Sequence, residues 1–165
     1  MPAYRIIPID PDFVARARAG RDDQGQLVEH HIAAGGEPLR DQLRRACAGE
    51  RIILASYCPF ESTGPYREYG PVFVSSELPA PAVPAWLPWE GDTPYLGRQI
   101  VVRGYSDEER IVDAYVSSRD QADADIARLF AQPDIRFILM RFAAWGCYAL
   151  RLERQEPPEP AGSGG

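Results

Sequence analysis

Residues 57–75 read YCPFESTGPYREYGPVFVS, and the rest of the chain is organised around this stretch. It leaves the apolar run that ends at Tyr57, makes an excursion punctuated by proline and glycine, and enters a second apolar strand at Pro71. Rigid surface loops of this kind hold side chains toward a partner. We call the excursion, residues 58–69, the anchor loop; its tip carries Tyr66, Arg67 and Tyr69.

The composition is that of an ordinary globular chain. The 165 residues are 45% hydrophobic and 25% charged, which predicts a single globular domain over residues 1–154 and a flexible Pro/Gly tail over 155–165. All 18 basic residues are arginine, so any fixed positive charge in a site is a guanidinium group, which suits carboxylate and phosphate. The net charge of −6 disfavours nucleic-acid binding.

Cysteine and histidine usage predicts neither a metal site nor a cofactor. The three cysteines include no C-x-x-C pair, the two histidines are adjacent in sequence, and no Gly-rich phosphate loop is present. An odd number of cysteines argues against a disulfide framework. The N-terminus lacks an apolar signal region and no run approaches membrane-spanning length, so we expect a cytoplasmic protein without membrane contact.

The pattern along the chain predicts an α+β fold. We expect a mostly antiparallel sheet of about seven or eight strands, two main helices and a long Pro-rich loop over residues 79–94. Asp10 and Pro11 predict the start of the first helix, and Asp120 is expected to cap the second, which should end before Pro133. Residues 41–48 are expected to be irregular or briefly helical, and residues 106–109 to form the turn of a hairpin.

Several short motifs are distributed along the chain: Leu39-Arg40, Ala46, Gly49-Glu50, Tyr57, Pro59-Phe60, Pro65-Tyr66, Gly70–Phe73 and Gly146–Ala149. In order and spacing they resemble those of a family of bacterial proteins catalogued as the twelve-hundred-and-third domain of unknown function. The resemblance covers nearly the whole chain apart from the tail, and it implies a bacterial source and one self-contained domain, without an activity.

The first candidate site binds an anion. Arg40 and Arg67 offer planar donors, and Tyr66 and Tyr69 offer phenolic hydroxyls, which together suit a carboxylate or a phosphate. In the alternative interpretation, Arg67 makes internal contacts within the anchor loop while the tyrosines pack. The first functional hypothesis is therefore a module that binds a small anionic or polar metabolite.

Cys147 is the candidate nucleophile. It follows Trp145 and Gly146 at the start of a strand, where a turn can expose a thiol, and His31 is the weak candidate for an activating base. This pattern would fit a cysteine-dependent hydrolase or transferase. The alternative is that Cys147 is a small buried apolar residue, the usual fate of a free cysteine.

Arg141 interrupts an otherwise apolar strand, and Arg151 lies in the strand that returns from it. If these point to one face with Arg40 or Arg67, the cluster needs an anion or a set of acids to be tolerated. Tyr148 completes the predicted ligand-binding set. A different hypothesis is a protein-interaction or homodimerisation module, in which the Pro-rich loop with its two tryptophans, or an exposed sheet edge, contacts the partner.

Overall fold

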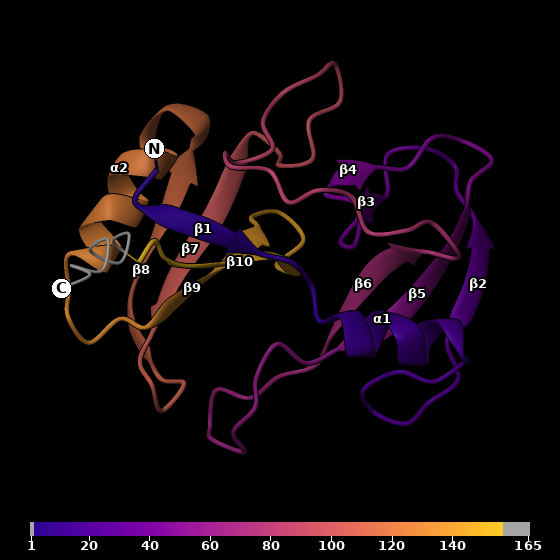
Figure 1. Ribbon diagram of the computed structural model, residues 1–165, viewed down its shortest axis with the longest axis horizontal. Helices are drawn as coiled ribbons and strands as arrows, with labels where there is room; N and C mark the ends of the chain where they lie inside the picture. Colours follow the sequence, from indigo (N-terminus) through magenta and orange to yellow (C-terminus); the bar gives the residue numbers. More distant parts are fainter. Residues whose placement is uncertain (1, 157–165) are drawn as a thin grey trace, which may run out of the picture.

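Two five-stranded β-sheets lie side by side in the computed structural model, which describes residues 2–156 (Figure 1). The first sheet has the strand order β1-β10-β9-β7-β8 and the second the order β2-β5-β6-β3-β4. The strands are β1 (Tyr4–Ile7), β2 (Glu29–Ile32), β3 (Pro38–Leu39), β4 (Arg44–Arg45), β5 (Arg51–Tyr57), β6 (Gly70–Ser75), β7 (Gln99–Tyr105), β8 (Ile111–Ser118), β9 (Phe137–Phe142) and β10 (Tyr148–Arg154).

The α+β class and the mostly antiparallel pairing are confirmed, but the predicted count of seven or eight strands is wrong. The described chain has ten strands in two sheets, and one pair, β3 with β6, is parallel. The two-residue strand β4 lies in the region 41–48 that was expected to be irregular or helical, and it pairs with the two-residue strand β3 around a turn in which Leu43 has a φ of 51°. Strands this short carry no alternation of apolar and polar residues, so the sequence pattern gives no sign of them.

The two helices begin and end close to the predicted positions. Helix α1 (Pro11–Arg18) starts as expected, because the carboxylate of Asp10 accepts the backbone N–H of Asp12 at 2.9 Å. The N-cap of helix α2 (Arg119–Phe130) is Ser118, whose side chain makes no capping bond. Asp120 lies inside the first turn, so the predicted cap is two residues too late. The acidic residue still lies at the positive end of the helix dipole.

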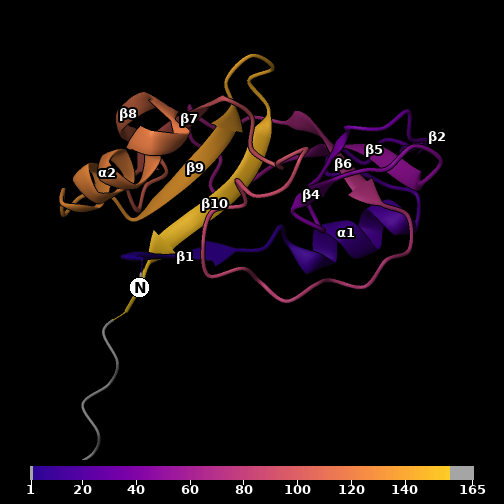
Figure 2. The same ribbon diagram turned by 90° about the horizontal axis from the view of Figure 1, so that it is seen from above.

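The core explains why β9 is so apolar. All six residues of this strand are buried, because α2 covers one face of the first sheet while α1 and the second sheet pack against the other. In Figure 2 the turn that connects β9 and β10 projects from the end of the first sheet, and the residues that follow it, Cys147 and Tyr148, contact Arg40 beside the second sheet. Arg141 is the one charged residue in β9, and it lies inside this packed region.

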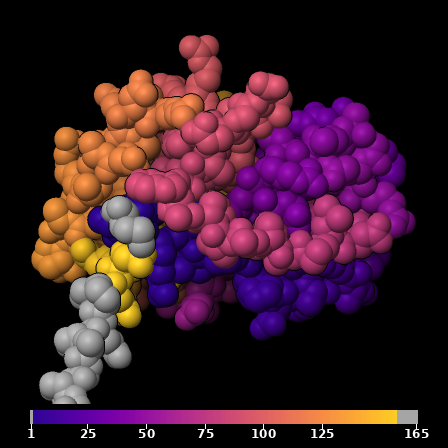
Figure 3. Space-filling model, turned by 45° about the horizontal axis from the view of Figure 1, so that its top comes forward, coloured from indigo at the N-terminus to yellow at the C-terminus, as the bar shows by residue number. Residues whose placement is uncertain are grey.

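The Pro-rich segment forms the predicted ordered connection. It runs from β6 back to the first sheet, across the surface between the two sheets (Figure 3). The core of the first sheet includes three residues from this segment and from its C-terminal end, Leu87, Tyr95 and Leu96. Trp89 packs against that core, whereas Trp86 is exposed. The tail predicted for residues 155–165 lies almost entirely outside the described residues. No helix in residues 2–156 has the length and apolar character needed to cross a membrane.

Candidate functional site

A cleft of about 430 Å³ lies where the turn between β9 and β10 approaches the second sheet. Its apolar wall consists of Leu54, Pro71, Phe73, Phe142 and Trp145. Trp145, at the rim, is 86% exposed. The polar groups in the lining are Glu37, Arg40, Arg45 and Cys147. The cleft therefore combines an apolar surface with two guanidinium groups and a thiol.

Arg40 is the best-buried charged side chain of the cleft, with 2% of its surface exposed. It follows β3, and its backbone N–H donates to the carbonyl of Phe73 on β6. This bond fixes the backbone position from which the side chain extends. Nε donates to the carbonyl of Tyr148 and Nη1 to that of Pro38, both at 2.8 Å. The guanidinium carbon lies 5.1 Å from the ring centroid of Phe142. These contacts hold the charge in one orientation beside the cleft.

Arg45 lies next to Arg40 and contacts the same aromatic ring, at 5.6 Å from the centroid. Its three nitrogens donate to the carbonyls of Gly36, Pro94 and Tyr95 at distances from 2.8 to 3.0 Å. Burial lowers the pKa of Arg45, and the charge of Arg40 lowers it further. Arg45 thus joins the Pro-rich segment to the second sheet while it brings a second positive charge to the cleft.

Neither guanidinium group has an acidic partner within residues 2–156. The hydrogen bonds of both groups end on carbonyl oxygens or on sulfur, whereas most other arginines of the described chain contact a carboxylate. A buried charge that is not matched by an opposite charge is costly unless hydrogen bonds stabilise it. Arg40 uses three of its five N–H donors, so one hydrogen on each terminal nitrogen is left for a ligand.

The thiol of Cys147 is placed by a tight turn. Gly146 has a φ of 74°, a conformation that favours glycine, and its N–H binds the carbonyl of Phe142 at 2.7 Å. The chain then returns as β10, and the half-buried Sγ of Cys147 accepts an N–H from Nη2 of Arg40 at 3.1 Å. The guanidinium group of Arg40 therefore lies beside the thiol of Cys147.

Arg141 lies in β9, the strand before this turn, and is also buried. Nη1 donates to the carbonyl of Gly146 at 3.2 Å, Nη2 pairs with Glu68 of the anchor loop, and Nε has no partner among the described residues. Burial lowers the pKa of Arg141, and the nearby Cys147 opposes that shift. The anchor loop thus reaches the β9–β10 turn through the carboxylate of Glu68.

The chain matches a known protein family over most of its length. Residues 36–154 match a family described as a protein of unknown function, DUF1203. The chain belongs to the DUF1203 family. The matched segment includes Arg40, Arg45, Arg141 and Cys147, and it excludes β1, α1 and β2. No curated protein and no solved structure matches the chain.

The anchor-loop residues of this DUF1203 protein do not join the cleft. Arg67 donates from Nη1 to the carbonyls of Phe60 and Ser62, and from Nε to the hydroxyl of Tyr69 at 3.3 Å. Its guanidinium carbon also lies 5.5 Å from the ring centroid of Tyr69, while Tyr66 is exposed. These are the internal loop contacts that the alternative interpretation of Arg67 described.

The remaining predicted residues lie apart from the thiol or contribute only backbone. His31 is on the outer strand β2, with Nε2 3.2 Å from a carboxylate oxygen of Glu29, and it lines a different cleft from that of Cys147. The structure does not bring the proposed cysteine–histidine pair together. The ring of Tyr148 packs in the core 5.0 Å from that of Tyr57, and only its carbonyl contacts Arg40.

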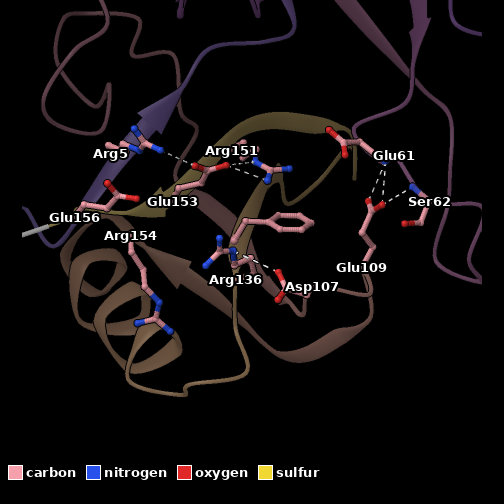
Figure 4. Close-up of a pocket in the computed structure, with 11 residues that line it drawn as sticks. Arg5, Glu61, Ser62, Asp107, Glu109, Arg136, Arg151, Glu153, Arg154 and Glu156 are labelled. Carbon is pink, nitrogen blue, oxygen red and sulfur yellow. Dashed lines mark hydrogen bonds and ion pairs between the residues drawn. The ribbon is translucent and has the colours of Figure 1, made fainter.

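A second cleft, of about 420 Å³, contains Arg151 and provides a useful contrast (Figure 4). Arg151 and Arg5 both pair with Glu153 at 3.0 Å, and Arg136 pairs with Asp107 at 3.3 Å. The carboxylate of Glu109 accepts the backbone N–H groups of residues 61 and 62. The arginines of these ion pairs are already matched by acids, whereas Arg154, which also lines this cleft, hydrogen-bonds among the described residues only to the carbonyls of Phe130, Gln132 and Ile135.

Sequence reasoning missed Arg45, Glu68 and the apolar wall. Arg45 directly follows Arg44, which forms an ion pair with Glu50. Two adjacent arginines in a sequence suggest ordinary surface contacts of this kind. Only the pairing of β3 with β4 turns Arg45 toward the Pro-rich segment. The sequence offers no signal for Glu68, because its partner is 73 positions later in the chain.

Proposed function

We propose that this DUF1203 protein binds a small anionic or polar metabolite in the cleft beside Cys147, with Arg40 and Arg45 as the cationic donors. The observation that carries the proposal is the pair of guanidinium groups without an acidic partner, both stacked near Phe142. A carboxylate or phosphate in the cleft would supply the missing opposite charge. Guanidinium groups bind such anions through paired, charge-assisted hydrogen bonds.

The shape of the cleft supports an organic ligand of modest size. Its volume of about 430 Å³ lies within the range of small-molecule sites. Leu54, Phe73 and Trp145 offer an apolar surface to the body of the ligand, while the arginines offer donors to its charged end. An inorganic ion alone would leave that apolar surface without contact.

Thermal unfolding in the presence of candidate anions tests the proposal. A panel of small carboxylates and inorganic phosphate should include compounds that raise the Tm of the wild-type chain, since a ligand at 100 times its Kd adds about 2.7 kcal/mol of stability. Arg40→Gln should abolish this rise. Arg40→Lys, which keeps the charge but not the planar donor, should weaken it.

Arg67→Ala provides the matched control, because Arg67 is an arginine of the predicted site that lies outside the cleft. Its Tm should respond to the same anions as that of the wild type. Stabilisation that persists in Arg40→Gln, or that disappears in Arg67→Ala, would remove the cleft from the binding site.

The second candidate function is an interaction or homodimerisation module, and the exposed Trp86 on the Pro-rich segment favours it. Trp86 is 57% exposed, whereas Trp89 of the same segment packs against the core. Large exposed aromatic side chains are enriched where proteins contact each other. Light scattering of the wild type and of Trp86→Ala tests this function; a monomer in both cases, at all concentrations, rejects homodimerisation.

A further inference from the structure

The three cysteines of the chain have different electrostatic surroundings. The Sγ of Cys58 lies 3.5 Å from the carbonyl oxygen of Phe60, which makes that thiol a hydrogen-bond donor. Cys47 is exposed, and Arg44, whose charge interacts with it, is already paired with Glu50. Only the sulfur of Cys147 accepts a hydrogen bond from a guanidinium group, and that group has no acidic partner among residues 2–156.

Such surroundings suit a sulfur nucleophile. The sulfur of a cysteine attacks electrophiles as the thiolate, and a neighbouring guanidinium group can donate hydrogen bonds to it. Arg40 donates directly to the Sγ of Cys147, and Arg141 is close enough for Cys147 to affect its pKa. The buried Nε of Arg141 has no partner among the described residues, so this second guanidinium group is not fully satisfied by the fold.

The same cleft lacks the base that hydrolysis requires. Both histidines of the chain lie on β2, and His31 contacts Glu29 rather than the cleft. Glu37 is the acid in the lining, and its two oxygens accept the backbone N–H groups of Ala34 and Gly35. Exchange between a thiol and a disulfide needs no general base, because the leaving group is itself a stable thiolate.

We propose that Cys147 exchanges with small disulfides that carry a carboxylate group, which Arg40 and Arg45 bind in the cleft. The Sγ of Cys147, having lost its proton to solvent, attacks one sulfur of the ligand. A new bond forms between that sulfur and Sγ as the ligand's own S–S bond breaks, and the second half of the ligand leaves as a thiolate that takes a proton from water. This inference rests on the proposed binding function and adds a ligand class to it.

Three small disulfides of different charge test the inference on the full chain. Dithiodiglycolate is anionic, hydroxyethyl disulfide is neutral and cystamine is cationic. The rate of mixed-disulfide formation at each cysteine is read by mass spectrometry of peptides prepared without reductant. At Cys147 the anionic reagent should react about 10-fold or more faster than the neutral one, relative to the same ratio at Cys47, because cationic surroundings raise the local concentration of an anion.

Substitutions separate this effect from simple exposure. Arg40→Gln should bring the anionic-to-neutral ratio at Cys147 close to that at Cys47, and Arg40→Lys should retain part of it if the glutamine variant does not fold. Arg67→Gln should leave the ratio unchanged. Equal ratios at Cys147 and Cys47 in the wild type, or preference for cystamine at Cys147, would overturn the inference.

The failure of this inference is distinguishable from that of the proposed function. Cys147→Ser retains both arginines, and its Tm in the presence of small carboxylates reports binding without exchange. If that variant is stabilised by carboxylates while the wild type shows no preference for dithiodiglycolate, the cleft binds anions and Cys147 does not react in the proposed way. If carboxylates do not stabilise Cys147→Ser and the wild type shows no preference for dithiodiglycolate, both the inference and the proposed function are rejected.

Discussion

Nη2 of Arg40 donates a hydrogen bond to the Sγ of Cys147 across 3.1 Å, although the two residues are 107 positions apart in the chain. The contact joins the second sheet to the turn at the end of the first, and Phe142 lies beside both residues. It places a guanidinium group without an acidic partner next to a thiol in a cleft. The predictions below concern the contacts that hold this arrangement together.

Arg45→Ala should destabilise the protein by about 2–3 kcal/mol. The substitution removes three donors from the carbonyls of Gly36, Pro94 and Tyr95, and bonds from charged donors are worth more than neutral ones. Urea unfolding measures the loss. Arg51→Ala, which breaks an exposed pair with Glu77, should cost much less stability and serves as the control. Equal losses in the two variants would contradict the role given to Arg45.

Glu68→Gln should loosen the anchor loop and cost about 1–3 kcal/mol. The change leaves the buried guanidinium group of Arg141 without its carboxylate partner. Hydrogen exchange should accelerate at backbone amides of residues 61–70. Glu61→Gln, an exposed change in the same loop, should alter stability by less than about 0.5 kcal/mol; a similar loss in both variants would show that the pair with Arg141 is not what holds the loop.

Gly104→Ala should destabilise the first sheet by about 1–3 kcal/mol. A Cβ at this position would lie 2.4 Å from Cδ1 of Ile135, which is fully buried, so one of the two elements has to move. Ile135→Val removes that methyl group. The double variant should therefore lose less stability than the sum of the two single losses. Urea unfolding of all three variants measures these losses. Additive losses would show that the contact with Ile135 is not the source of the strain.

The contribution of Glu50 should depend on pH. The hydrogen bond from Arg44, followed by that from the backbone N–H of Cys47, lowers the pKa of Glu50 to about 2. A carboxyl group with a lowered pKa stabilises the fold above its ordinary pKa, and this contribution disappears as the pH falls toward the folded-state value. Glu50→Gln should therefore cost about 1 kcal/mol at neutral pH, since solvent screens the partly exposed pair, and progressively less between pH 4.5 and pH 2.

Chemical denaturation at several pH values measures this difference. Glu77→Gln, which makes the same carboxylate-to-amide change in an exposed pair with Arg51, is measured in parallel as the control. A Glu50→Gln difference that stays constant down to pH 2 would contradict the stabilising role of the Arg44 pair.

The fold class was predictable because its signals are local. The cap at Asp10 and the apolar stripe of α1 follow the ordinary rules for a helix, and the apolar run 137–140 of β9 reports burial on both faces. The division into two sheets was not predictable, since it depends on which distant strands pair. Strands β3 and β4, which have two residues each, were not predictable either. Their pairing comes from tertiary contacts rather than from a pattern in the sequence.

The candidate site was predictable only in part. Arg40 and Cys147 stood out one by one, but their contact is long-range and no spacing rule predicts it. Arg67 and Tyr69 are two positions apart in an extended loop, which lets them contact each other, and this local contact removes Arg67 from the cleft. Arg45 carried no signal because the direction of its side chain depends on the pairing of β3 with β4.

Alkylation of Cys147 in the presence of a small dicarboxylate tests the central claim most directly. Iodoacetamide is neutral, so its rate at each cysteine reports access rather than attraction. Succinate bound between Arg40 and Arg45 should slow the reaction at Cys147, leave Cys47 unaffected, and lose its effect in Arg40→Gln. A rate at Cys147 that is unchanged by succinate in the wild type, or slowed equally in Arg40→Gln, would contradict anion binding in this cleft.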